Sequence, residues 1–259
     1  MKILFVGDIV GREGRRILAQ KLARLKSSHQ IDFTIINVEN AAAGFGITPP
    51  LAAEILEAGA DVMTSGNHIW DKKEIYEYLK EERRLLRPAN YPDGVPGYGS
   101  YVGRTERGIP VAVLNLQGRI FMPAIDCPFR MADREIEKLR AKAQVIFVDF
   151  HAEATSEKMA LGWHCDGRVS AIIGTHTHIP TADQRILPGG TAYLTDAGMT
   201  GPYHSIIGMG IESGLDRFLT ALPRRLDNAE GDVRLAAVVV DVDEVSGRAR
   251  SIERFLEED

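Results

Sequence analysis

The chain has 259 residues, of which 44% are hydrophobic and 26% charged, and its formal net charge is −5. This length suits one domain spanning residues 1–259 and excludes a long multidomain assembly, while the composition excludes disordered and fibrous proteins. The negative charge supplies no general field that would hold polyanions, so long nucleic acid is not an expected partner.

The sequence shows no pattern typical of disulfide-bonded, secreted or membrane-spanning proteins. Cys127 and Cys165 are the two cysteines, too few and too isolated for a disulfide framework. The amino-terminal segment MKILFVGDIVGREGRR has one short apolar run before its charged residues, which is not typical of a signal peptide. No stretch approaches the apolar length of a membrane span. We therefore expect a cytoplasmic protein without a membrane partner.

Apolar, β-branched runs alternate with amphipathic segments along most of the chain, an order typical of α/β proteins. Runs that are apolar throughout suit strands in a sheet covered on both faces. The expected elements, in chain order, are strand Lys2–Val6, helix Gly14–Lys26, strand Phe33–Val38, helix Pro50–Ala58, strand Asp61–Thr64, helix Lys73–Arg83, strand Ile109–Leu116, helix Asp133–Ala143, strand Val145–Phe150, helix Ser156–Trp163 and strand Val169–Gly174.

Two regions depart from this alternation. The segment Arg87–Arg107 is dense in Pro, Gly and Tyr, which predicts loops and a short antiparallel strand. A short helix is expected near Leu215–Leu222, and the runs Val233–Asp243 and Arg248–Phe255, joined by Ser246-Gly247, predict a hairpin. The whole pattern predicts an α/β sandwich with mixed sheets flanked by helices around one continuous core.

Polar residues that can hold metals follow five of the expected strands. In α/β sheets, ligands bind outside the carboxyl ends of the strands, so these residues are expected to meet at one edge although they lie far apart in sequence. They are Asp8, Glu39, Asn40, Asn67, His68, His151, His176 and His178.

Each of these motifs has an ordinary structural explanation when taken alone. Asp8 alone would usually be interpreted as a helix cap or turn former, and Asn67 as part of an ordinary turn. For His176 and His178 alone, a pair on the surface is the default interpretation. Together, however, they offer more ligands than one ion needs, which favours two ions that share a bridging carboxylate. Oxygen and nitrogen ligands without thiolate favour iron, manganese or zinc.

The same motifs resemble those of the calcineurin-like metallophosphoesterases. The order Gly7-Asp8, Glu39-Asn40, Gly66-Asn67-His68, His151 and His176-Thr177-His178 follows the superfamily pattern over about two thirds of the chain. Within the superfamily, segments such as NVENAAAGFGIT and SGNHIWDKKEI resemble the bacterial YmdB-like 2′,3′-cyclic-nucleotide 2′-phosphodiesterases. The resemblance implies a metallophosphoesterase-like sandwich.

The resemblance also implies a set of residue roles. Two metal ions, iron being favoured by the resemblance, would share Glu39 as a bridge. One would be held with Asp8, Asn40 and His178, and the other with Asn67, His151 and His176. His68 would be the general acid, with the positioning of Asn67 or of the phosphate as its alternative role.

This chain departs from the superfamily pattern at three points. The segment that begins at Asp8 lacks the usual histidine two residues later, a glutamate replaces the bridging aspartate, and no acid directly follows His68. Asn40 would complete the coordination sphere of the first ion.

The implied activity is a phosphodiesterase reaction on cyclic nucleotides or related small phosphate esters, by attack of a metal-bound hydroxide. Phe45, Trp70 and Tyr203 offer aromatic faces that suit a nucleobase. A phosphoprotein phosphatase or nuclease with the same metal centre is the alternative enzyme, and a regulatory interaction protein with a structural metal site is the alternative outside catalysis. A homo-oligomer is compatible with the sequence.

Overall fold

The computed structural model describes residues 1–223 and 225–259. Its strands lie where most of the apolar runs predict them. They are β1 (Lys2–Val6), β2 (Asp8–Ile9), β3 (Phe33–Asn37), β4 (Val62–Thr64), β5 (Ser100–Arg104), β6 (Pro110–Gln117), β7 (Val145–His151), β8 (Ala171–Thr175), β9 (Arg185–Ile186), β10 (Ala192–Leu194), β11 (Met199–Pro202), β12 (Val233–Val242) and β13 (Ala249–Glu258).

The helices follow the amphipathic segments. Helix α1, for example, buries Ile17, Leu18, Leu22 and Leu25, whose spacing places them on one face. The helices are α1 (Gly11–His29), α2 (Pro49–Glu57), α3 (Ile75–Glu81), α4 (Pro128–Arg140), α5 (Thr155–Cys165) and α6 (Ile211–Thr220), with one 3₁₀ turn, η1 (Asn67–Trp70).

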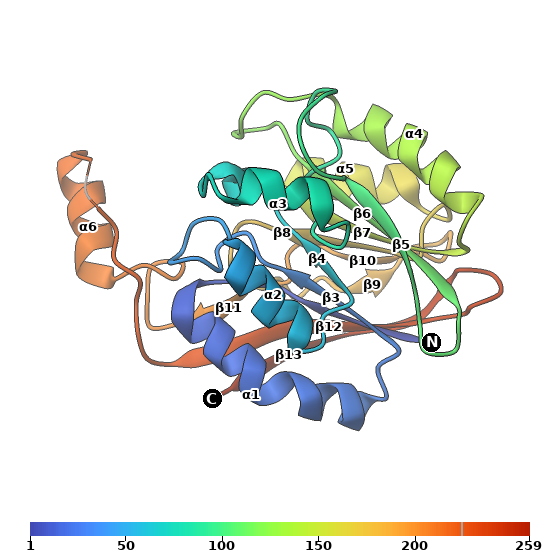
Figure 1. Ribbon diagram of the computed structural model, residues 1–259, viewed down its shortest axis with the longest axis horizontal. Coiled ribbons are helices and arrows are strands. Elements are labelled where there is room, and N and C mark those ends of the chain that lie inside the picture. Colours follow the sequence, from blue (N-terminus) through green and yellow to red (C-terminus); the bar gives the residue numbers. More distant parts are fainter. Residues whose placement is uncertain (224) are drawn as a thin grey trace.

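The described residues form two mixed sheets packed face to face, with helices outside both (Figure 1). The first sheet has the order β2-β11-β12-β1-β3-β4, with β13 paired to β12. The second has the order β5-β6-β7-β8-β10-β9. Strands β1, β3 and β4 are parallel, as are β6, β7 and β8, so each group directs its carboxyl ends to one edge. The predicted sandwich with flanking helices is confirmed.

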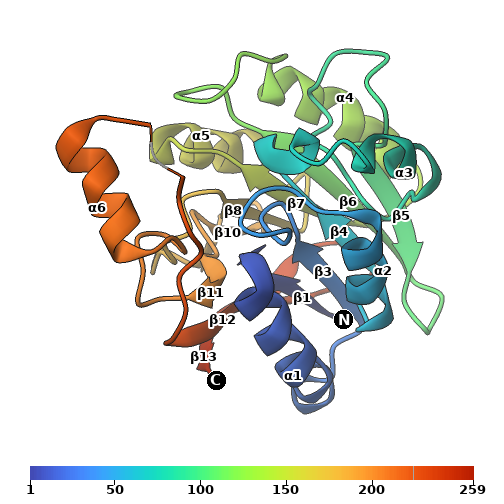
Figure 2. The same ribbon diagram turned by 60° about the vertical axis from the view of Figure 1, so that its left-hand side comes forward.

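The prediction of one continuous core is wrong, because both sheets bury both of their faces. One apolar cluster lies between the sheets and includes Phe5 and Phe147, whose ring centroids are 5.2 Å apart. A second cluster joins the first sheet to α1, α2 and α3, and a third joins the second sheet to α4 and α5. The molecule is therefore layered as helix, sheet, sheet and helix (Figure 2).

Helix α6 is the exception to this layering, since it projects away from the sandwich in both views (Figures 1 and 2). It begins four residues before the helix that the sequence predicts, and of its own residues Gly214 alone is buried. Phe218 and Leu219 are 79% and 83% exposed. Among the described residues, no helix combines the length and apolar character needed to cross a membrane.

Candidate metal centre

The polar residues expected at the strand ends do meet at one edge of the sandwich. Ligand atoms of Glu39, His151 and His176 all lie within 4.8 Å of one another, and so do those of Asp8, Glu39 and His178. Glu39 belongs to both groups. The two groups reproduce the carboxylate and histidine members of the two ligand sets that the resemblance implies.

Glu39 lies at the centre of the cluster and is 1% exposed. Its Oε1 is 2.9 Å from His151 Nε2, and its Oε2 accepts a hydrogen bond from the main-chain N–H of His68 at 3.3 Å. Burial alone would raise the pKa of Glu39, but the charge and hydrogen bond of His151 outweigh it and lower this pKa to about 2. His151 therefore favours the ionised form of the Glu39 carboxylate.

The position before Asn67 must be glycine for this arrangement to exist. A Cβ atom on Gly66 would lie 2.2 Å from His151 Nε2 and 2.3 Å from Glu39 Oε2. No side chain tolerates such distances without displacing both groups. Gly66 thus allows the backbone after β4 to pass directly against the cluster.

A chain of hydrogen bonds fixes the ring of His151. Thr175 donates its hydroxyl hydrogen to Asp149 Oδ1 at 2.7 Å, so its oxygen accepts from His151 Nδ1 at 2.9 Å. Asn37 donates to the other oxygen of Asp149. Burial raises the pKa of Asp149 to about 6. A proton is thereby placed on His151 Nδ1, and Nε2 is the ring nitrogen that faces the cluster. Burial opposes protonation of this ring, but the neighbouring carboxylates outweigh it and raise the pKa of His151, so Nε2 would bind a metal only after losing its own proton.

His176 and His178 present neutral rings. His176 Nδ1 is 3.0 Å from His151 Nε2, and burial, together with the charge of His151, lowers the pKa of His176 to about 3. His178 donates from Nδ1 to the carbonyl of Ile207 at 2.8 Å, and burial lowers its pKa. Its Nε2 lies 3.3 Å from Asn40 Oδ1. Each of the three imidazoles therefore directs one ring nitrogen towards the carboxylates.

Two further oxygens in this cluster are buried without a hydrogen-bond donor among the described residues: Asp8 Oδ1 and Asn67 Oδ1. Buried polar atoms normally have a partner, because leaving one unsatisfied is costly. Asp8 Oδ2 does accept from the main-chain N–H of His176, at 3.3 Å. A bound transition-metal ion would satisfy these oxygens together with the neighbouring imidazole nitrogens, so the donor set fits metal ions.

His68 lies at the margin of this cluster, with 28% of its side chain exposed. Its Nδ1 is 2.8 Å from Asp71 Oδ2. The η1 turn brings residues 68 and 71 to the same side, so an acid three positions downstream serves where the superfamily pattern has an adjacent one. The sequence interpretation noted Asp71 only as too distant to be the adjacent acid and gave it no role, although the spacing of three residues is the signal that could have revealed the contact. Phe45 packs edge to face with the His68 ring at 5.1 Å.

The three aromatic residues expected at the rim differ in their surroundings. Trp70 packs edge to face with Tyr76 and Tyr91, at 5.6 and 5.3 Å between centroids. The guanidinium of Arg234 stands 5.4 Å from the centroid of the Tyr203 ring. One face of Tyr203 is therefore occupied, whereas Phe45 contacts the His68 ring and Trp70 lies in the same η1 turn as His68.

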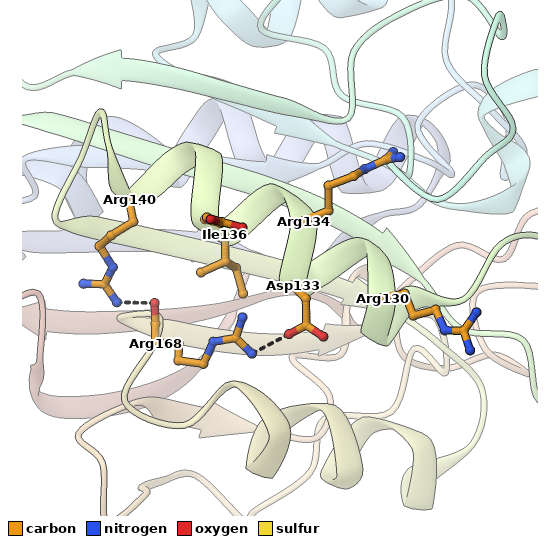
Figure 3. Close-up of a pocket in the computed structure, with 7 residues that line it drawn as sticks. Arg130, Asp133, Arg134, Ile136, Arg140 and Arg168 are labelled. Carbon is orange, nitrogen blue, oxygen red and sulfur yellow. Dashed lines mark hydrogen bonds and ion pairs between the residues drawn. The ribbon is translucent and has the colours of Figure 1, made fainter.

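A separate surface hollow of about 670 Å³ lies over α4 (Figure 3). Arginines dominate its lining, but three of them have partners: Arg168 donates to Asp133, Arg140 donates to the carbonyl of Arg168, and Arg134 forms an ion pair with Glu135 at 3.6 Å. None of the residues lining this hollow belongs to the cluster of carboxylates and histidines. The hollow is therefore separate from the candidate metal centre.

Similarity to known proteins agrees with the motifs. A family model described as YmdB-like protein matches residues 4–255. The chain is 52% identical over 257 residues to the 2′,3′-cyclic-nucleotide 2′-phosphodiesterase of Bacillus subtilis (strain 168), covering 99% of this chain and 97% of that one.

Solved structures agree as well. A hypothetical protein from Thermus thermophilus matches with a TM-score of 0.94 and 43% identity over the full length of both chains. A phosphatase from Mycoplasma pneumoniae matches with a TM-score of 0.93 and 34% identity, covering 100% of this chain and 93% of that one. These matches confirm the metallophosphoesterase type of fold, and the chain belongs to the YmdB-like family.

Proposed function

We propose that this protein is a phosphodiesterase with two metal ions that hydrolyses cyclic nucleotides or related small phosphate esters. The observation that carries the proposal is the sharing of Glu39 by both ligand groups. A single carboxylate between two sets of ligands is the arrangement that holds two ions close enough to act on one phosphate.

The proposed ligands divide around Glu39. Asp8, Asn40 and His178 would complete one site, and Asn67, His151 and His176 the other, with iron as the favoured metal and manganese or zinc as alternatives. When bound, the ions would neutralise the phosphate oxygens and lower the pKa of a water molecule. The protein itself fixes the ring orientations through Thr175 and the Ile207 carbonyl, so little rearrangement accompanies binding.

We assign the general acid to His68. The Asp71 carboxylate accepts a hydrogen bond from Nδ1, which orients Nε2 as the atom that would give up a proton. The departing alkoxide of a ribose ester needs such a proton. The main-chain N–H of His68 donates to Glu39, so the ring is held beside the proposed bridge.

Our proposal for the substrate class is supported by the aromatic residues near His68 and by the activity named for a relative. Phe45 and Trp70 lie on its side of the cluster and suit stacking against a base with modest selectivity. The Bacillus subtilis relative is named as a 2′,3′-cyclic-nucleotide 2′-phosphodiesterase. We therefore propose nucleoside cyclic phosphates as substrates, in preference to phosphopeptides or long nucleic acids.

The proposal is tested by elemental analysis of the purified protein together with a substrate panel under identical metal loading. The panel contains 2′,3′-cyclic AMP, 3′,5′-cyclic AMP, a nucleoside monophosphate and a phosphopeptide. We expect two metal equivalents and the highest kcat/KM on a cyclic diester. A maximum of one equivalent refutes the paired centre, and a tenfold preference for the phosphopeptide identifies a protein phosphatase.

Three further expectations stay predictions: a single metallophosphoesterase domain over residues 1–259, a cytoplasmic location and a homo-oligomer. The exposed Phe218 and Leu219 of α6 offer a direct test of the last. Serine at both positions should lower the mass measured by light scattering if α6 lies in an interface, while an unchanged mass places any interface elsewhere.

A further inference from the structure

A buried ion pair lies directly behind the turn that carries His176 and His178. Lys158 of α5 donates from Nζ to Asp196 Oδ2 at 2.6 Å, and both side chains are 1% exposed. None of the roles assigned above uses either residue. Buried ion pairs are costly to desolvate, so one next to a candidate metal centre calls for an explanation.

The Asp196 carboxylate also accepts hydrogen bonds from this turn and from the segment that follows Asp196. Its Oδ2 also accepts from the main-chain N–H of Thr177 at 3.2 Å and from the Thr177 hydroxyl at 2.8 Å. Its Oδ1 accepts from the N–H of Gly198 at 2.9 Å. Thr177 is therefore attached to Asp196 through both backbone and side chain.

The backbone of the turn adopts a conformation that needs such support. His176 and His178 have φ values of +99° and +65°, in the left-handed region that non-glycine residues rarely adopt. The two histidines belong to different ligand groups, one with His151 and the other with Asp8. The conformation of Thr177 thus sets the separation between an imidazole of one group and an imidazole of the other.

Lys158 connects this turn to the other half of the cluster. Helix α5 begins four residues after His151, and the aliphatic part of Lys158 reaches the start of the turn, where a Cβ atom on Gly174 would lie 3.1 Å from Lys158 Cδ. The ion pair therefore links the element that follows His151 to the turn that carries the other two histidines.

We propose that Lys158, Asp196 and Thr177 form a positioning clamp that fixes the relative placement of the two metal sites by holding the His176-Thr177-His178 turn. The proposal rests on the proposed paired centre. The clamp touches no substrate; it acts through the two histidines. Loosening the clamp should lower the affinity for both ions together. Loss of a single ligand should lower chiefly the affinity of the site to which that ligand belongs.

Thr177→Val is the sharpest test, because it removes the hydroxyl from the clamp while keeping the side-chain shape and leaving no buried charge. Thr177→Ser restores the hydroxyl. Thr195→Val is the matched control: Thr195 also donates its hydroxyl to a carboxylate, Asp183 Oδ2 at 2.6 Å, and its side chain makes no hydrogen bond to residues 176–178. Melting temperature, chelator competition for manganese and the electron paramagnetic resonance spectrum of the manganese-loaded protein are measured for all three variants.

We expect Thr177→Val to melt near the control, to lose about 10- to 100-fold in affinity for both ions and to change the spin coupling of the manganese pair. Its activity should fall mainly in kcat, and serine should restore binding, coupling and turnover. Wild-type affinity and coupling in Thr177→Val would overturn the clamp while leaving the paired centre intact. A wild-type protein that binds only one ion would instead refute the paired centre, and the clamp with it.

Discussion

Replacing the shared carboxylate, Glu39→Gln, should weaken both metal sites at once. Glu39 and Asp8 carry the two negative charges in the two ligand groups, against four positive charges on two divalent ions. The substitution keeps the side-chain length but leaves one negative charge, so the net charge of the loaded centre rises from +2 to +3. Removing an outer-sphere partner of a metal ligand already costs about 10- to 100-fold in affinity. Loss of the bridge should cost about 100-fold or more at each site, or about 2.8 kcal/mol.

The assay is titration with manganese in the presence of a competing chelator, followed by elemental analysis of the desalted protein. His178→Ala and His151→Ala are the matched controls, since each belongs to one ligand group. These controls should retain one tightly bound equivalent, while Glu39→Gln should retain none at the concentration that saturates the wild type. A Glu39→Gln protein that still holds one ion with wild-type affinity would refute the bridging role.

The other predictions concern single positions. His68→Ala should retain its metals but lose about 10²–10⁴-fold in turnover of esters with poor leaving groups and much less on a p-nitrophenyl ester; equal losses on both substrates would remove it from proton transfer. Asp71→Asn should lower turnover in the same selective way and by a smaller factor, and a uniform loss would contradict this. Gly66→Ala should cost about 10²-fold in kcat/KM with loss of metal, because its Cβ would displace His151; unchanged metal content would count against the close approach of Gly66 to His151. Burial raises the pKa of Cys165 to about 12, so at pH 8 a thiol reagent should label the partly exposed Cys127 alone until denaturant is added, and fast labelling of two thiols would contradict its burial.

The elements and the ligand cluster were predictable because both depend on local sequence patterns. Apolar runs mark the strands, and the carboxyl ends of parallel strands meet at one edge whatever the lengths of the connections. Glu39, His151 and His176 therefore came together as expected from position alone.

The supporting residues were not predictable in the same way. Asp149 and Asp196 look like ordinary acids in the sequence, and their partners Thr175 and Lys158 lie 26 and 38 positions away. Which buried donor reaches which acceptor depends on how two sheets and a helix pack. Likewise, the division of the core into three clusters follows from the pairing of strands, and no single segment encodes it.

The position of β12 has a consequence for how the chain folds. This strand lies between β1 and β11, and β11 in turn pairs with β2, which begins at Asp8. During synthesis, β1 and β2 emerge first, yet they cannot complete their sheet until residues 233–242 have left the ribosome. Pairing over so long a stretch of chain is slow and leaves strand edges exposed meanwhile. Asp8 should therefore reach its final place only after translation has passed β12, and uptake of the proposed metal ions would then be a late event in the maturation of this protein.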